Sequence, residues 1–166
     1  MVAPPRWGIL ATPEGLAVAF RNAQPASVPR TLQRVQRDFE EQVDRVNVMV
    51  DFDGDRRTGY DFTVSNTDGI ADSIITNENN FNSDWDGNWQ HAVGSDYEAW
   101  TVEVLIPWHI APMRDATDKR TLGIYVDRVV GSTGERSAWP YASFERPRFL
   151  SDFADDPSSQ FDKLLT

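Results

Sequence analysis

Residues 44–65, DRVNVMVDFDGDRRTGYDFTVS, contain two runs of alternating apolar and polar residues that flank a polar turn. The apolar residues that share one face are Val46, Val48, Val50 and Phe52 in the first run and Tyr60, Phe62 and Val64 in the second. A period of two is typical of a strand with one buried face. The stretch is therefore predicted to be a β-hairpin, in which Gly54 and Gly59 supply the unusual backbone dihedrals of the turn.

The same period recurs along the chain. It is clear in WTVEVLIP (100–107) and LGIYVDRVV (122–130), and shorter in GLAVAF (15–20), DSIIT (72–76) and WQHAVGSD (89–96). The best helical candidate is 31–46, but residues 31–36 also alternate, and we expect a strand followed by a loop there. Many short strands separated by turn clusters predict an all-β fold: an antiparallel β-sandwich with jelly-roll or immunoglobulin-like layers and little helix.

Length and charge limit the possible partners. The 166 residues suit one domain, 1–166, in which the acidic segment 146–166 is expected to be a C-terminal extension that packs on the sandwich. A formal net charge of −10 disfavours nucleic acid and anionic membrane surfaces, but it is compatible with cations and neutral polyols. The absence of cysteine excludes disulfides and thiolate chemistry. No apolar run approaches the ~20 residues that insertion into a bilayer needs.

The aspartates of the hairpin raise the question of calcium. An EF-hand loop needs glycine at position 6, but that position holds Arg56 when counted from Asp51 and Thr58 when counted from Asp53. The hairpin explains the stretch without a metal. A structural calcium ion held in some other geometry remains the alternative, with these candidate ligands: Asp51, Asp53, Asp55 and Asp61.

The tryptophans indicate a different kind of site. Trp85 and Trp89 lie in NNFNSDWDGNWQ (79–90), a stretch rich in amides and carboxylates. An indole face stacks on the C–H groups of a sugar, while neighbouring polar side chains bind its hydroxyls. The candidate ligand-binding residues are Trp85, Trp89, Asn82, Asp84 and Asp86, with Trp139 as a further aromatic. For Trp89, packing back onto the sheet edge is an equal alternative.

Signals of catalysis are few. The chain has two histidines, and the GSTG stretch at 131–134 lacks the spacing of a nucleophile elbow. Paired carboxylates of a glycoside hydrolase are possible among 26 acidic residues, but many acids are also typical of a solvated surface. We therefore expect no enzymatic activity and rank a glycoside hydrolase last.

The order of these motifs resembles that of the carbohydrate-binding module family 9-like domain of bacterial envelope proteins. The motifs are GLAVAFRNAQP, the hairpin of residues 44–65, DWDGNWQHAV, WTVEVLIPW and LGIYVDRVV, and the match covers roughly residues 15–145. The resemblance implies a jelly-roll sandwich that binds poly- or oligosaccharide without catalysis. It also implies a periplasmic, cell-envelope or secreted location, within a larger envelope protein.

The resemblance carries three further expectations. Relatives have about one more strand pair before residue 15, so the sequence is expected to be truncated at its N-terminus, and members of the family can hold structural calcium. In characterised binders two tryptophans enclose a terminal sugar, and a Glu and an Arg on the two hairpin strands assist. Those polar positions are Asn47 and Thr63 here. This difference motivates an alternative, in which the domain is a structural or interaction sandwich without a sugar site.

Overall fold

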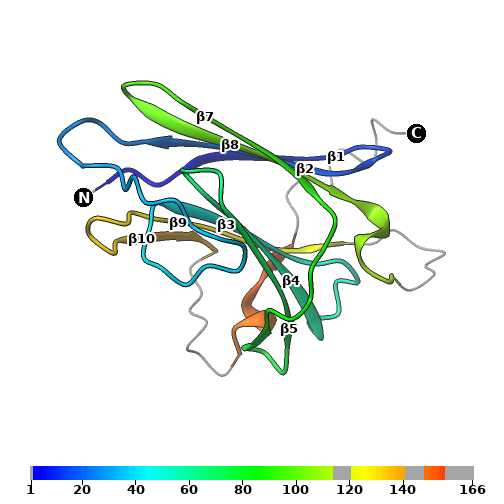
Figure 1. Cartoon of the computed structure of the whole chain (residues 1–166). Coiled ribbons are helices and arrows are strands. Elements are labelled where there is room, and N and C mark those ends of the chain that lie inside the picture. The colour runs from blue at the N-terminus through cyan, green and yellow to red at the C-terminus, as the bar shows by residue number, and fades with distance from the viewer. Residues whose placement is uncertain (1, 114–120, 141–147, 156–166) are drawn as a thin grey trace.

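The alternating segments form two antiparallel sheets that face each other in the computed structural model, which describes residues 2–113, 121–140 and 148–155 (Figure 1). The first sheet has the order β1-β2-β8-β7: Arg6–Ala11, Gly15–Ala23, Ala99–Pro107 and Gln90–Ser95. The second has the order β10-β9-β3-β4-β5-β6: Arg136–Trp139, Gly123–Val129, Arg45–Asp51, Thr58–Ser65, Ile70–Thr76 and Asn80–Asn82. A short strand, β11 (Ala154–Asp155), also pairs with β9.

The predicted all-β antiparallel sandwich is thus confirmed. Among the residues that the structure describes, helix is limited to two 3-10 turns, η1 (Trp108–Ile110) and η2 (Leu150–Asp152). Within the described ranges no helix has the length and apolar character that crossing a membrane requires. The hairpin β3–β4 has the expected register, with Val48 opposite Phe62 and Val50 opposite Tyr60.

The main core lies between the sheets and uses the inward residues that alternation identifies. The second sheet contributes Val46, Val48, Val50, Phe62, Val64, Ile124 and Val126, and the first contributes Leu16, Val18, Phe20, Trp100, Val102, Val104 and Ile106. Burial of such side chains stabilises the fold by about 1.5–3 kcal/mol each. The strands of the hairpin are therefore central because they place one apolar face against the other sheet.

A second apolar cluster covers part of the outer face of the second sheet, where half-exposed strands were expected. Met49 and Tyr125 point outward but are buried against the C-terminal residues Phe149, Leu150 and Phe153. Phe153 stacks on Tyr125 with ring centroids 5.9 Å apart. Residues 148–155 thus pack on the sandwich, while residues 146–147 and 156–166 of the expected extension lie outside the described residues.

Residues 24–44 form neither the expected strand nor a helix. Their backbone is held by side chains instead. The buried carboxylate of Asp44 accepts hydrogen bonds from the backbone N–H of Thr31 at 2.8 Å and of Gly131 at 2.7 Å, and the Thr31 hydroxyl accepts one from the N–H of Asp44. Such local bonds compete with ladder formation, and this explains why the alternation of residues 31–36 was misleading.

The hairpin turn is organised by Asp51. Its carboxylate accepts hydrogen bonds from the N–H of Gly54 at 3.0 Å and of Arg56 at 2.7 Å, and the Arg56 guanidinium pairs with it at 3.2 Å. Gly54 has the expected positive φ of 70°. The second positive φ belongs to Arg56, not to Gly59. Gly59 is needed for space, because a Cβ there would lie 3.0 Å from the Leu150 side chain.

Two further features of the sandwich are strand β1 and a buried arginine. Strand β1 was not anticipated, although all six of its residues pair with β2. Arg128 lies on the inward face of β9 with Ile124 and Val126 and is fully buried. Its guanidinium donates to the carbonyls of Ala3 and Ala23 and to Gln24 Oε1, which also accepts from the Trp100 indole. This network closes one end of the sandwich.

We predict that Arg128→Met unfolds the sandwich more easily. The substitution leaves buried carbonyls without donors, so the free energy of unfolding should fall by about 2–4 kcal/mol. Urea denaturation followed by tryptophan fluorescence measures the change. Arg21→Met, at an exposed arginine of β2, is the matched control and should change stability by less than about 0.5 kcal/mol. Equal stability of the two variants would contradict the assigned role of the network.

Candidate functional site

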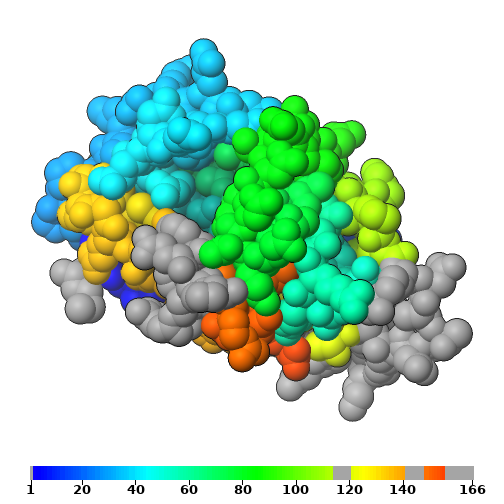
Figure 2. Space-filling model, turned by 90° about the horizontal axis from the view of Figure 1, so that it is seen from below, coloured from blue at the N-terminus to red at the C-terminus, as the bar shows by residue number. Residues whose placement is uncertain are grey.

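A pocket of about 310 Å³ opens on the outer face of the second sheet, beside the part that the C-terminal residues cover. Its floor comes from β3, β4 and β5. One wall is the segment 38–41 and the other contains Phe81 and Ser83. Figure 2 shows this face, with the cyan atoms of the first wall and the green atoms of the second on two sides of a hollow. The size is at the lower end of small-molecule sites.

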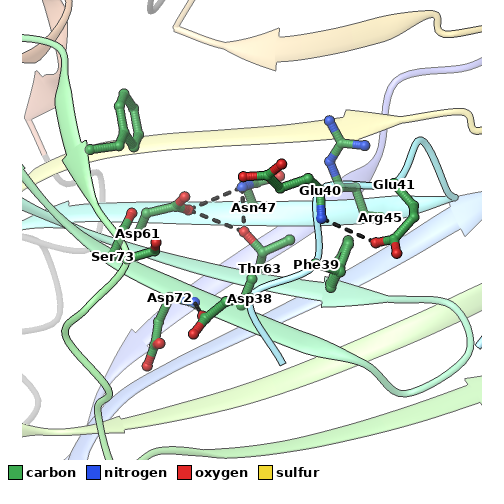
Figure 3. A pocket seen from close by; sticks show the side chains of 13 residues that line it. Asp38, Phe39, Glu40, Glu41, Arg45, Asn47, Asp61, Thr63, Asp72 and Ser73 are labelled. Carbon is green, nitrogen blue, oxygen red and sulfur yellow. Dashed lines mark hydrogen bonds between the residues drawn. The ribbon is translucent and has the colours of Figure 1, made fainter. Parts of the chain in front are cut away.

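The floor is polar because the outward residues of the hairpin are polar at this point. Asn47 faces Thr63 across the β3–β4 ladder, and the Asn47 amide donates to the Thr63 hydroxyl at 2.6 Å and to Asp61 Oδ1 at 3.0 Å (Figure 3). The amide oxygen of Asn47 is buried, and within the described residues no donor satisfies it. A buried acceptor of this kind costs about 1–3 kcal/mol until a donor reaches it.

Asp61 is the floor carboxyl with the most strongly shifted pKa. Burial raises the pKa of its carboxyl to about 7, and the like charge of Asp127 acts in the same direction. Hydrogen bonds from Asn47 and Thr63 and the charge of Arg45 oppose the rise in this pKa. Asp61 is therefore poised to exchange a proton near neutral pH.

Asp127 lies beside the floor, opposite Asn47 on the neighbouring strand β9. Its buried carboxylate accepts a hydrogen bond from the Tyr125 hydroxyl at 2.8 Å and forms an ion pair with Arg136. Burial raises the pKa of Asp127, and the Arg136 charge opposes this. The pair compensates the buried charge and keeps Asp127 as a fixed neighbour of the pocket.

The first wall runs along the edge of β5. The N–H of Asp38 donates to the Ile70 carbonyl at 3.0 Å, and the N–H of Asp72 donates to the Asp38 carboxylate at 3.2 Å. Arg37 strengthens the attachment by pairing with Asp72 at 2.9 Å and with Asp86 at 3.0 Å. These contacts place the half-buried ring of Phe39 and the carboxylates of Glu40 and Glu41 over the pocket.

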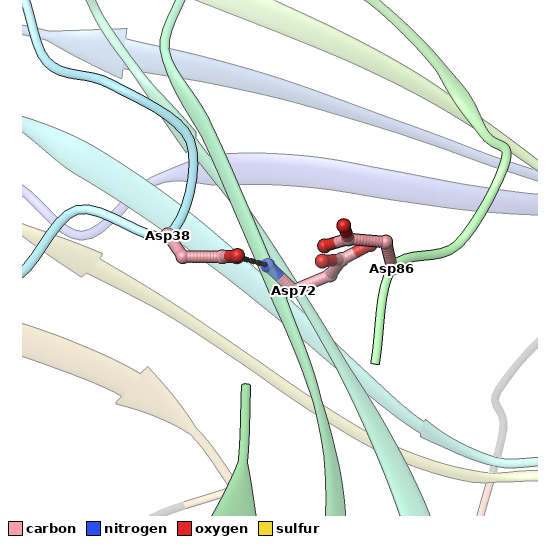
Figure 4. Close-up of side chains that lie close together, drawn as sticks. All are labelled: Asp38, Asp72 and Asp86. Atoms are coloured by element: carbon pink, nitrogen blue, oxygen red, sulfur yellow. Dashed lines mark hydrogen bonds between the residues drawn. The ribbon is translucent and has the colours of Figure 1, made fainter. Parts of the chain in front are cut away.

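Asp38, Asp72 and Asp86 are the only group of potential metal-ligating residues in the described ranges, with ligand atoms within 4.8 Å of one another (Figure 4). Arg37 already pairs with two of the three. Asp72 Oδ2 also accepts from the N–H of Gly87 at 2.7 Å and from the Trp89 indole at 3.0 Å. The guanidinium is thus the counter-charge of this cluster.

The four aspartates suggested for calcium are not brought together. Asp51 is buried inside the hairpin turn and satisfied by Gly54 and Arg56, whereas Asp61 belongs to the pocket floor. Asp55 accepts from the N–H of Arg57. The physical reason is that the hairpin turn satisfies Asp51 and Asp55 internally, whereas the strand that follows places Asp61 on the outer face of the sheet. Calcium binding itself remains a prediction.

The residues suggested for sugar binding are dispersed. Trp89 is buried in the core, and Trp85 is half-buried with its ring 5.1 Å from Tyr60 and 6.1 Å from Phe62. Gly87 packs on Trp85 so closely that a Cβ would lie 2.6 Å from its ring.

Trp139 is 39% exposed but packs against Trp7, with centroids 5.1 Å apart, at the far edge strand β10. Asn82 and Asp84 are exposed, and Asp86 pairs with Arg37. The 79–90 stretch nevertheless contributes Phe81 and Ser83 to the pocket.

Several pocket residues could not be found by sequence reasoning. Asn47 and Thr63 were identified only through the resemblance. Phe39 and Glu40 lie in the 31–46 segment, whose periodicity did not distinguish a helix from a strand and loop, and Asp38 joins β5 only in the folded chain. An aromatic residue between acids at 38–41 was the one available signal, and it is a weak one.

We predict that Arg37→Ala loosens the first wall. Loss of the guanidinium leaves the buried Asp72 carboxylate with two donors, so the free energy of unfolding should fall by about 1–3 kcal/mol. Thermal denaturation measures the change, and exchange of the Asp38 amide should accelerate. Arg34→Ala, at an exposed arginine of the same segment, serves as the control. Unchanged amide protection in Arg37→Ala would argue against the attachment.

We predict a pH-dependent effect of Asp61→Asn. The folded pKa of about 7 lies above the ordinary value of 3.8, so the folded wild type gains stability from the bound proton at low pH and loses it as the pH rises to 7. The variant should therefore be more stable than wild type by roughly 2–4 kcal/mol at about pH 8 and similar at about pH 4. Urea unfolding at both values measures this. An advantage that is independent of pH would contradict the raised pKa.

Comparison with solved structures agrees with the fold. The chain is similar to a candidate carbohydrate-binding protein from Bacteroides uniformis, with a TM-score of 0.65 and 13% identity over 91% of this chain and 77% of that one. It is also similar to a carbohydrate binding module family 9 from Caldicellulosiruptor kristjanssonii. The glucose complex gives a TM-score of 0.58 and 13% identity over 91% and 74% of the two chains, and the cellotriose complex gives 0.58 and 12% over 96% and 85%.

No family sequence model matches the chain, and no curated protein matches it. Identities of 12–13% establish the architecture and not the ligand. The chain therefore has the fold of the family 9 carbohydrate-binding modules.

Proposed function

We propose that the chain is a non-catalytic carbohydrate-binding domain and that its ligand site is the pocket on β3, β4 and β5. The observation that carries this proposal is the combination of two kinds of contact in one concavity. Asn47, Asp61 and Thr63 supply hydrogen-bonding groups at the floor, and the rings of Phe39 and Phe81 lie in the two walls. A saccharide presents hydroxyls at its edge and C–H groups on its faces, which match these two kinds of contact.

The buried acceptor of Asn47 supports the same proposal. Its amide nitrogen is engaged with Asp61 and Thr63, which leaves the amide oxygen for a donor from a ligand. A sugar hydroxyl is such a donor, provided that the exposed Glu40 and Glu41 side chains give way. The fold shared with modules whose complexes contain glucose and cellotriose adds support.

Part of the site proposed from the sequence, the 79–90 stretch, borders this pocket. The 79–90 stretch forms the second wall through Phe81 and Ser83, and Phe81 is 36% exposed. Sugar binding on the outer side of that stretch, by Asn82 and Asp84 next to Trp85, is the second arrangement to be tested. A domain outside the cytoplasm, attached to a larger envelope protein, is part of the same proposal and rests on the resemblance.

Titration with a panel of neutral oligosaccharides tests the function. We expect affinities between about millimolar and micromolar, followed by tryptophan fluorescence because Trp89 bonds to Asp72 beside the pocket. Thr63→Val and Asn47→Ala should weaken binding at least about tenfold. Asn82→Ala is the control on the outer side of the second wall and should bind normally.

The outcomes separate the alternatives. Loss of binding in Asn82→Ala with retention in Thr63→Val would transfer the site to the outer side of the 79–90 stretch. Silence with every saccharide would favour a structural or interaction sandwich. Oligosaccharides incubated with the protein should be recovered intact by chromatography, and new reducing ends would overturn the non-catalytic part of the proposal.

A further inference from the structure

The charge of the pocket is strongly unbalanced. Five of its lining residues are acidic and one is basic: Asp38, Glu40, Glu41, Asp61 and Asp72 against Arg45. Asp72 contributes little negative charge to the opening, because its carboxylate points toward Trp89 and pairs with Arg37. The other four carboxylates have no ion pair with a cation in the part of the chain that the structure describes.

Burial is the main cause of the raised pKa values in the pocket, and neighbouring carboxylates act in the same direction. Burial and the neighbouring carboxylates of Asp72 and Asp86 raise the pKa of Asp38. Burial and the charge of Asp127, on the same face of the sheet, raise the pKa of Asp61 as well, and Arg45 on the adjacent strand opposes the rise. A cation in the pocket would favour the ionised form of both groups, and an anion would be repelled.

The shape of the pocket decides what kind of cation fits. A volume of about 310 Å³ with two aromatic rings in its walls exceeds what a bare metal ion needs. The acceptors are also of mixed type, with carboxylates at Glu40 and Asp61 and a hydroxyl and an amide at Thr63 and Asn47. This set suits a polyol that carries a charged N–H donor, since an ammonium forms charge-assisted bonds with carboxylates.

We propose that the pocket selects saccharides that bear a free, protonated amino group over their N-acetylated, neutral and uronic-acid counterparts. The inference rests on the proposed carbohydrate function and deepens it. Neutral sugars would use the floor and the rings alone. An amino sugar would in addition place its ammonium among the carboxylates of Asp38, Glu40 and Asp61.

Matched trisaccharides test this preference at about pH 6.5 and low ionic strength, where an amino sugar is largely protonated. A β-linked glucosamine trisaccharide should bind at least about tenfold more tightly in calorimetry than its N-acetylated counterpart, with a uronic-acid trisaccharide weakest. Equal or tighter binding of the N-acetylated sugar would overturn the inference while leaving the proposed function intact. Absence of binding by all three, and by neutral glucans, would overturn both.

The chain carries a net charge of −10, so any cationic ligand is attracted to it in general. This general attraction must be separated from selection by the pocket. Glu40→Gln combined with Glu41→Gln should reduce the ratio of the two affinities about tenfold. Glu103→Gln combined with Glu14→Gln, at two exposed acids on β8 and in the β1–β2 turn, removes the same charge and should leave the ratio unchanged. An equal effect of both variants, or binding of trilysine as tightly as the amino trisaccharide, would contradict selection by the pocket.

Discussion

The arrangement of the pocket depends on one buried carboxylate, that of Asp72. Its Oδ2 accepts from the Arg37 guanidinium, the Gly87 N–H and the Trp89 indole. These three donors come from the wall segment, from the loop before β7 and from the core between the sheets. A buried carboxylate is tolerated only when donors compensate its desolvation, so the three elements are held at one position on β5. These bonds fix the first wall of the pocket against the edge of β5.

The outer face of the second sheet is divided between two uses. Where Met49 and Tyr125 point outward, residues 149–153 cover the sheet and form a second apolar cluster. Two residues further along the same strands, Asn47 and Asp127 point outward and the surface is polar. An apolar cover over these groups would leave them without solvent or partners. The pocket therefore lies where the alternation of β3 and β9 changes from apolar to polar side chains.

Particular residues show how far sequence reasoning extends. The hairpin, its register and its inward residues follow from a period of two, because each strand must bury one face. The same reasoning misplaces the strand at residues 31–36, since Asp44 and Thr31 form side-chain bonds that outcompete a ladder. It also selects Trp85 and Trp89 as exposed binding residues, because they lie in a polar stretch. In the structure both rings pack on Phe62. Burial of a large apolar ring is favourable even when its neighbours in the sequence are polar.

By itself the sequence determined the sandwich, most of its strands, the acidic surface and, through the resemblance, the two floor positions Asn47 and Thr63. These properties depend on local periodicity and composition. Only the tertiary structure decided that Asp61 joins that floor, and that Phe39 and Phe81, which are 42 positions apart in the sequence, line the same pocket. No local sequence pattern encodes this arrangement. It depends on the buried charge of Asp72, which is compensated by hydrogen-bond donors that are distant in the chain.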